Sequence, residues 1–156
     1  ASGLAKAYQL DDEKAKVFCI LGDGEMQEGS VWEAAMFAAA QKLDNFTVFL
    51  DYNGIQASER VQAITKIDPV REKWEAFGWQ VEEINGHDLM AIQDVVQKFR
   101  DNIYHKPLFV IAHTHKGHGI PFIQDCADCH MRNPKNEEWE TVCRAFHISP
   151  EELSLL

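Results

Sequence analysis

The fold is decided by two stretches of sequence, LGDGE at residues 21–25 and FTVFLDYNGI at residues 46–55. Each stretch closes an apolar run, rich in β-branched or aromatic residues, with an abrupt polar turn, which is typical of a strand leaving a sheet. An apolar helical segment separates the two turns, and this order predicts two parallel strands joined by a helix. Asp23 and Asn53 are therefore expected at the carboxyl ends of these strands, where open α/β sheets bind ligands.

Oxygen ligands are concentrated at this predicted edge. Asp23 offers a carboxylate and Asn53 an amide oxygen, and the main-chain carbonyl of Ile55 follows two residues later. These groups suit a hard cation such as Mg²⁺ or Ca²⁺. Gly24 keeps the backbone accessible, and the glycine turn at Gly29, ahead of the next helix, suits a phosphate group. A divalent cation between Asp23 and a phosphate would convert the repulsion of two anions into attraction.

The rest of the chain continues the alternation of strands and helices. Apolar segments with strand or helix periodicity are separated by polar and glycine turns. Right-handed crossovers between successive strands then predict an α/β fold with a doubly wound, mainly parallel sheet and helices on both faces. The predicted strands are residues 16–21, 46–51, 79–84 and 108–112, and the predicted helices are residues 1–10, 30–42, 69–77, 89–99 and one after residue 136.

Several positions mark the expected ends of these helices. Residues 30–33 and 149–152 each match the capping box that opens a helix. Asp68 before Pro69 predicts an N-cap followed by proline at the first helical position. Gly78 predicts the end of that helix, because glycine readily adopts the left-handed conformation of a helix C-terminus.

Other residues are assigned to structure or to a loop. Trp74 and Phe77 are predicted core residues, and His87 is assigned a structural role. Residues 52–66 lack a strong period and are predicted to form a long loop, of the kind that often carries function. We expect the tip of this loop to face the ligand.

Length, composition and charge narrow the possible classes of protein. The chain of 156 residues is 46% hydrophobic, which suffices for one domain with a core. Its formal net charge of −10 argues against nucleic acid or an anionic membrane surface as a partner, because both require a basic face. No membrane-spanning apolar run and no signal-peptide pattern is visible, so the cytoplasm is the expected location. Four cysteines in a chain of this length do not suggest a secreted disulfide framework.

The spacing of the two turn motifs resembles a known family. Gly22-Asp23-Gly24, a spacer of 28 residues, and Asn53-Gly54-Ile55 are similar to the thiamine diphosphate and metal motif of thiamine-dependent enzymes. Five further segments narrow the resemblance to the amino-terminal, diphosphate-binding domain of transketolases, and the similarity covers nearly the whole chain. These segments are Gln27-Glu28-Gly29, Trp32-Glu33-Ala34, Phe77-Gly78-Trp79, Gly86-His87-Asp88 and Lys116-Gly117-His118-Gly119.

This resemblance implies a role for each matching residue. Asp23, the side chain of Asn53 and the main chain of Ile55 would hold the cation, and Gly24 would help to cradle the diphosphate. His130 precedes a proline and an acidic helix, as a substrate- and diphosphate-contacting histidine does in transketolases. Its imidazole suits hydrogen bonding to phosphate or proton transfer, so it is the candidate catalytic residue. The expected thiamine diphosphate site comprises Gly22, Asp23, Gly24, Glu25, Asn53, Ile55 and His130.

The resemblance also implies a reaction and a partner. Transketolases transfer a two-carbon ketol unit between sugar phosphates, with thiamine diphosphate as electron sink. Residues 1–156 would be a single diphosphate-binding domain, truncated at its amino terminus and lacking the pyrimidine-binding domain. We therefore expect a pyrimidine-binding partner domain or subunit, in a dimer or heterotetramer. Two alternatives are open, namely a subunit of another thiamine enzyme (a 2-oxoacid dehydrogenase or decarboxylase) or a noncatalytic module that keeps the fold.

Two segments allow more than one interpretation. Cys126, Cys129 and His130 form a Cys-x-x-Cys-His pattern, which occurs in zinc sites and at c-type haem attachment sites. Isolated cysteines more commonly pack or remain free thiols. Glu28 and Glu33 are either carboxylates that complement the dipole at a helix start or, by the resemblance, residues at a dimer interface near the cofactor.

Overall fold

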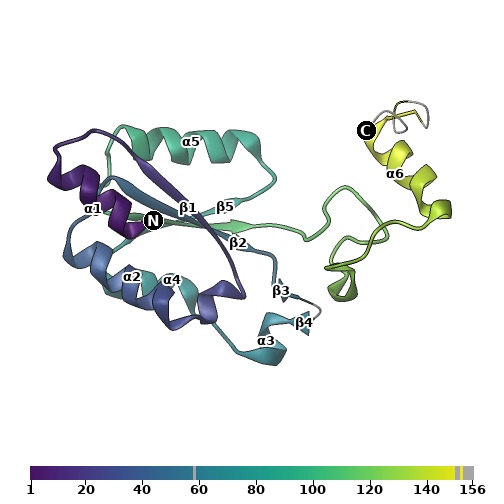
Figure 1. Cartoon of the computed structure of the whole chain (residues 1–156), viewed down its shortest axis with the longest axis horizontal. Helices are drawn as coiled ribbons and strands as arrows, with labels where there is room; N and C mark the ends of the chain where they lie inside the picture. Colours follow the sequence, from purple (N-terminus) through teal and green to yellow (C-terminus); the bar gives the residue numbers. More distant parts are fainter. Residues whose placement is uncertain (58, 150–151, 153–156) are drawn as a thin grey trace.

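Four parallel strands form the central sheet of the chain, in the order β1-β2-β6-β5 (Figure 1). The computed structural model describes residues 1–57, 59–149 and 152. Every predicted strand is present with its ends within one residue of the predicted range, so the parallel α/β architecture is confirmed. The strands are β1 (Val17–Gly22), β2 (Phe46–Tyr52), β5 (Gln80–Asn85) and β6 (Leu108–His113).

Helices cover both faces of this sheet, as predicted (Figure 1). On one face lie α1 (Ser2–Leu10), α2 (Gly29–Ala40) and α4 (Val70–Phe77), and on the other lies α5 (Leu89–Arg100). The connections from β1 to β2 and from β2 to β5 advance across the sheet, whereas the connection from β5 to β6 returns. Because crossovers between parallel strands are right-handed, the returning helix must lie on the opposite face.

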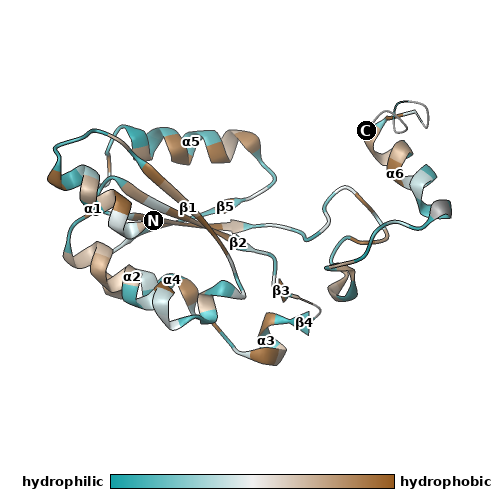
Figure 2. Ribbon diagram, viewed as in Figure 1, coloured by the Kyte–Doolittle hydropathy of each residue, from teal (hydrophilic) through white to brown (hydrophobic). Residues whose placement is uncertain are grey.

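A separate hydrophobic cluster fills each face of the sheet. On the side of α2 and α4, the buried Trp74 ring stacks on Phe109 with ring centroids 3.8 Å apart. On the side of α5, Phe99 is buried and packs edge-on against Phe18. Neighbouring residues of β6 point to opposite faces, so Phe109 and Val110 belong to different clusters. Figure 2 shows the sheet as predominantly hydrophobic strands between helices that carry hydrophilic positions on their surfaces.

The pairing register aligns the carboxyl ends of the strands. Gly22 pairs with Asp51, and Asp51 pairs in turn with Ala112 of β6. The turns that begin with Asp23 and Asn53 therefore leave the sheet at the same edge. This arrangement confirms that the two motifs predicted from the sequence lie together in space.

Two predicted helix starts are wrong. α2 begins before the predicted capping box, with Glu28 at its N-cap and no side-chain cap, so Ser30 already lies in the first turn. α4 begins after Pro69, which is itself the N-cap. The Asp68 carboxylate does not cap this helix, because it accepts a hydrogen bond of 2.7 Å from the Tyr52 hydroxyl. A tertiary contact has thus taken the side chain that the local pattern assigned to the helix.

Two other helix signals are confirmed. Gly78 ends α4 in the left-handed conformation, with φ of 100°. The Ser149 N–H donates to the Glu152 carboxylate at 2.7 Å, and the Glu152 N–H donates to the Ser149 hydroxyl at 3.2 Å, which are the two hydrogen bonds of a capping box. The residues that would extend this last helix lie outside the described ranges.

The segment predicted as a long loop contains short elements. β3 (Ile55–Gln56) and β4 (Glu59–Arg60) pair as an antiparallel hairpin, and α3 (Val61–Ile64) follows directly. This hairpin stands beside the carboxyl edge of the sheet, as Figure 1 shows. The prediction of a featureless loop is therefore wrong, because elements of two to four residues are too short to show a period.

After β6 the chain leaves the sheet in a long segment with little regular structure. It contains the turns η2 (Ala127–Cys129) and η3 (Asn136–Glu138) and ends in α6 (Trp139–Phe146). Figure 1 shows α6 standing apart from the sheet and its helices. Within the described ranges, no helix combines the length and the apolar composition that crossing a membrane requires.

Candidate functional site

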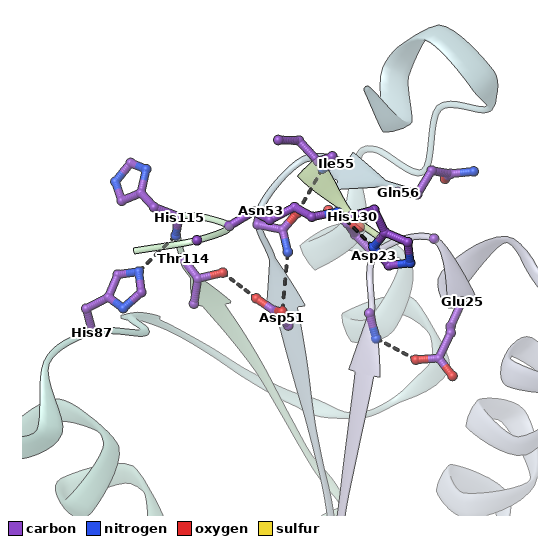
Figure 3. Close-up of a pocket in the computed structure, with 14 residues that line it drawn as sticks. Asp23, Glu25, Asp51, Asn53, Ile55, Gln56, His87, Thr114, His115 and His130 are labelled. Carbon is purple, nitrogen blue, oxygen red and sulfur yellow. Dashed lines mark hydrogen bonds between the residues drawn. The ribbon is translucent and has the colours of Figure 1, made fainter. Parts of the chain in front are cut away.

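A pocket of about 590 Å³ lies at the carboxyl edge of the sheet (Figure 3). Its walls come from the turns after β1 and β2, the β3–β4 hairpin, the turn between β5 and α5, and the segment after β6. Every residue of the predicted cofactor site lines this pocket. The lining residues are Gly22, Asp23, Gly24, Glu25, Asp51, Asn53, Ile55, Gln56, His87, Thr114, His115, Lys116, Gly117 and His130.

Asp23 is a buried carboxylate at this edge. Its side chain is only 2% exposed, and its Oδ2 atom accepts a hydrogen bond of 2.5 Å from the Gly54 N–H. Burial raises the pKa of Asp23, the N–H groups of Gly54 and Gly24 oppose that rise, and the neighbouring Asp51 charge adds to it. Among the described residues, no lysine, arginine or histidine forms an ion pair with Asp23. The fold therefore holds a negative charge that these residues do not neutralise.

The turn after β2 is held by a network around Asp51. The Asn53 side-chain nitrogen donates to Asp51 at 3.2 Å, and the Thr114 hydroxyl donates to the other oxygen of the same carboxylate. The Asn53 Oδ1 atom accepts from the Ile55 N–H at 2.9 Å. A carbonyl oxygen has two acceptor positions, so this bond leaves one for a further partner. These contacts fix Asn53 beside the pocket, where Figure 3 shows it between Asp51 and Ile55.

The turn after β1 is closely packed. A Cβ atom at Gly24 would lie 2.8 Å from the Cβ atom of Gln56, so only glycine fits there without a shift of the hairpin. Gln56 is itself fixed, because its Oε1 atom accepts from the Gln27 side chain at 2.5 Å. The Glu25 carboxylate accepts from the Gly22 N–H at 2.7 Å and so stabilises the turn. Gly24 and Gln56 together form a narrow wall of the pocket.

Lys116 and His130 form another wall of the pocket. The Lys116 Nζ atom lies 3.0 Å from the His130 Nδ1 atom and donates to the Ala57 carbonyl at 3.1 Å. Because an ammonium group can only donate, Nδ1 accepts and the ring proton of a neutral His130 resides on Nε2. Lys116 is the one lysine or arginine among the described residues that line the pocket. It therefore places a positive charge opposite Asp23.

His87 joins two walls of the pocket. Its Nε2 atom accepts a hydrogen bond of 2.8 Å from the His115 N–H, and its ring stacks on His118 with centroids 3.7 Å apart. Burial lowers the pKa of His87, and the charges of His118 and His115 lower it further. A neutral His87 can accept from the His115 backbone, so it ties the turn before α5 to the segment after β6. This contact supports the structural role predicted for it, although the residue also lines the pocket.

The sequence did not identify every residue of the site correctly. Gly29 is a wrong prediction as a phosphate contact, because the turn η1 (Glu25–Gln27) separates it from the pocket and it is not among the lining residues. Gln56 and Thr114 were missed because neither carries a charge or a motif. Lys116 was noted in the Lys-Gly-x-Gly segment without a role, and its position at the end of β6 could have suggested one.

The donor set suits a hard cation. A buried carboxylate with a raised pKa and a second carboxylate nearby would be relieved by a positive ion. The described residues contain no group of three or more His, Cys, Asp or Glu side chains placed to hold a metal. A cation at Asp23 would therefore also need amide, main-chain or ligand oxygens, which Mg²⁺ and Ca²⁺ accept.

The same result bears on the zinc interpretation of the Cys-x-x-Cys-His pattern. Cys126 and Cys129 lie together, but His130 is directed to Lys116. No metal-binding group of three ligands forms there in the part of the chain that the structure describes. The structure thus gives the zinc and haem interpretations no support.

The buried carboxylate of Asp23 predicts a pH-dependent stability in the absence of divalent cations. Because its pKa is raised on folding, its contribution is fully present below the unfolded pKa of about 3.9 and is lost as the pH rises through the raised value. Urea unfolding in EDTA should therefore show the wild-type chain becoming less stable than Asp23→Asn as the pH rises through this range. Parallel profiles for the two chains would show that the carboxylate is not destabilised by burial.

Comparison with known proteins gives a family match over nearly the whole chain. Residues 3–154 match the family described as transketolase, thiamine diphosphate binding domain. The transketolase of Campylobacter jejuni has the same fold, with a TM-score of 0.83 and 30% sequence identity. That superposition covers 94% of this chain and 23% of the Campylobacter chain.

Curated relatives show the same relationship in sequence. The chain is 42% identical over 140 residues to an apulose-4-phosphate transketolase subunit of Actinobacillus succinogenes, which covers 90% of this chain and 50% of that protein. It is 37% identical over 138 residues to human transketolase, covering 87% of this chain and 22% of the human protein. The chain therefore spans about half the length of the bacterial relative and a smaller share of the human enzyme.

Proposed function

Because the chain belongs to the transketolase family of thiamine diphosphate-binding domains, we propose that it forms the diphosphate- and cation-binding half of a transketolase-like enzyme. The proposed reaction is the transfer of a two-carbon ketol unit between sugar phosphates. The observation that supports it most directly is the single pocket into which the fold brings Asp23, Asn53, Ile55 and His130.

A divalent cation, Mg²⁺ or Ca²⁺, would be held by the Asp23 carboxylate, the Asn53 amide oxygen and the Ile55 carbonyl. Support for this assignment comes from the buried Asp23 charge, which is not paired with a basic side chain among the described residues. The hydrogen bonds of Asn53 to Asp51 and Ile55 hold the turn in position before a ligand arrives. Such preorganisation reduces the cost of binding.

Thiamine diphosphate would place its diphosphate beside the turn formed by Gly22, Asp23 and Gly24, where a side chain at Gly24 would clash with Gln56. Lys116 would balance part of the negative charge from the opposite wall. When bound, this cofactor supplies the electron sink that the cleavage of a carbon–carbon bond requires. The protein's own contribution is to anchor and orient it.

His130 would act on the oxygen atoms of the substrate or the diphosphate. Lys116 holds its Nδ1 atom, so the Nε2 atom is available to donate a hydrogen bond or to exchange a proton. A histidine held at one nitrogen and free at the other is suited to this role, because its orientation and tautomer are both fixed.

A partner must complete the proposed enzyme. The relative in Actinobacillus succinogenes is named as one subunit of a transketolase, and this chain covers only half of it. We therefore expect a pyrimidine-binding subunit or domain to close the pocket, in a dimer or a heterotetramer. That partner would bind the part of the cofactor that this pocket does not hold.

The test is reconstitution with the pyrimidine-binding subunit of a split transketolase. With thiamine diphosphate and Mg²⁺, the mixture should convert a ketose phosphate and an aldose acceptor, whereas the chain alone should not. His130→Ala should lower kcat/KM by about 10²- to 10⁴-fold, the usual contribution of a general acid–base group. The measurement is the rate of formation of the aldose product.

Two controls separate the possible outcomes. His105→Ala removes an exposed histidine that does not line the pocket and should leave the rate unchanged. A 2-oxoacid offered in place of the ketose tests the alternative thiamine chemistry. Consumption of the 2-oxoacid alone would replace the transketolase assignment, and binding of the cofactor without turnover in any mixture would favour a noncatalytic module.

A further inference from the structure

Two cysteines lie together immediately before His130. Cys126 is the N-cap of the turn η2, and Cys129 is its last residue. Residues three apart in a 3₁₀ turn lie on the same side, which places the two sulfur atoms face to face. The Cys129 thiol donates to the Cys126 sulfur, and the two sulfur atoms are 2.6 Å apart. A disulfide needs about 2.05 Å, so a bond between them requires only a small movement of two side chains.

Both thiols can be reached from solvent. Cys126 and Cys129 are half-buried, and both are free thiols in the structure. The other cysteines among the described residues lie elsewhere, Cys19 in β1 and the buried Cys143 in α6. The hydrogen bond to Cys126 raises the pKa of the Cys129 thiol, and Arg132 partly opposes this effect. Cys129 therefore retains its proton while Cys126 is the sulfur free to react first.

The turn between the two cysteines is weakly held, although its flanks are anchored. Before it, the Asp125 N–H donates to the Lys116 carbonyl at 2.8 Å, and the Asp125 carboxylate pairs with His115 at 2.9 Å. After it, His130 contacts the Lys116 ammonium. The turn itself has only a long hydrogen bond of 3.4 Å from the Cys129 N–H to the Cys126 carbonyl. A covalent link across this turn would fix the residue that follows it.

We propose that Cys126 and Cys129 are a reversible redox pair, and that hydrogen peroxide converts them to an intramolecular disulfide which fixes His130 in the wall of the pocket. The existence of the pair does not depend on the proposed function, whereas its consequence for catalysis rests on the role proposed for His130. Reduction by a small thiol returns the turn to its looser state.

The oxidation is balanced in two steps. The Cys126 thiolate attacks one oxygen of hydrogen peroxide, the O–O bond breaks, and the released hydroxide takes up a proton and leaves as water. The Cys129 sulfur then attacks the sulfur of the sulfenic acid at Cys126, losing its own proton, and a second water leaves. Two electrons pass from the two sulfurs to the peroxide. The products are one disulfide and two molecules of water.

The test uses the complete 156-residue chain without cofactor, so that its result is independent of thiamine diphosphate binding. Hydrogen peroxide should remove two of the four free thiols, and peptide mass mapping should locate a bond between Cys126 and Cys129 that dithiothreitol reverses. Amide hydrogen exchange of residues 126–131 should slow by about tenfold or more in the oxidised chain, because local opening is suppressed. Cys126→Ser and Cys129→Ser should each abolish both effects, and Cys19→Ser should abolish neither.

Three results would overturn the proposal. Disulfides between two chains would show that the pair does not close within one molecule. Zinc bound stoichiometrically and lost in Cys126→Ser would assign the pair to a metal. A disulfide that forms without slowing exchange at His130 would show that the bond does not position this residue. If the disulfide forms as expected but thiamine diphosphate does not bind, the redox pair stands and the proposed function fails.

Discussion

Asp23→Asn is expected to abolish cation-dependent binding of thiamine diphosphate, with a loss of affinity greater than about 100-fold. Replacing a residue that only orients a metal ligand typically costs about 10- to 100-fold in metal affinity, so removing the ligand itself should cost more. The amide of asparagine keeps an acceptor for the Gly54 N–H, so the turn should persist. What is lost is the negative charge, which is what attracts the cation.

The measurement is a thermal-shift titration with thiamine diphosphate, with and without Mg²⁺. At a ligand concentration of about 100 times Kd, binding to the folded chain alone stabilises it by about 2.7 kcal/mol. The wild-type chain should show this shift only with both ligands, and Asp23→Asn should show none. Asp94→Asn is the matched control, since it removes an exposed carboxylate on α5 and should bind as the wild type does.

The direction of the effect on the ligand-free chain distinguishes a lost ligand from a damaged fold. Because burial raises the pKa of Asp23, the Asp23→Asn chain without cation should be at least as stable as the wild type at neutral pH. Loss of binding together with lower stability would point to misfolding. Undiminished cation-dependent binding would remove Asp23 from the metal site.

Trp74→Ala is expected to lower the free energy of unfolding by about 3–5 kcal/mol, the usual cost of deleting a large aromatic side chain from a core. Trp74 is only 1% exposed and contacts the rings of both Phe109 and Trp79. Its indole N–H has no hydrogen-bond partner among the described residues, so its removal ends one unfavourable burial. The net loss should therefore lie toward the lower end of this range.

Urea unfolding followed by far-ultraviolet circular dichroism measures this change, because the signal does not depend on the deleted indole. Leu89→Ala is the control, since Leu89 is 78% exposed at the start of α5 and should change stability by less than about 0.5 kcal/mol. A loss of less than about 1 kcal/mol for Trp74→Ala would mean that the cluster between α4 and the sheet does not stabilise the fold as described.

The sheet could be predicted from sequence because its signals are local and strong. Each strand is an apolar run that ends at a polar turn, and the helices between them fix a parallel order. The sequence also placed Asp23 and Asn53 at one edge, since carboxyl ends of parallel strands coincide. Trp74 was correctly assigned to the core, because an aromatic residue at helical spacing next to a strand is usually buried.

The errors arose where a distant contact decides the local structure. Asp68 has the composition of an N-cap, but the Tyr52 hydroxyl, which lies 16 positions earlier, takes its carboxylate. Gln56 became part of the pocket wall through a hairpin too short to show a period. The contact between Lys116 and His130 joins residues on two sides of an irregular segment. Side-chain partners of this kind cannot be read from composition or spacing.

The common register of the strand ends makes ligand affinity a measure of correct assembly. If β1 slipped by one residue against β2, Asp23 would move by about 3.3 Å along the strand direction and its side chain would turn to the other face. A chain that was compact but wrongly paired would thus keep its secondary structure and lose its affinity. Quality control of this fold therefore does not require a separate sensor: only a correctly registered molecule can gain the protection against unfolding and proteolysis that its ligand confers.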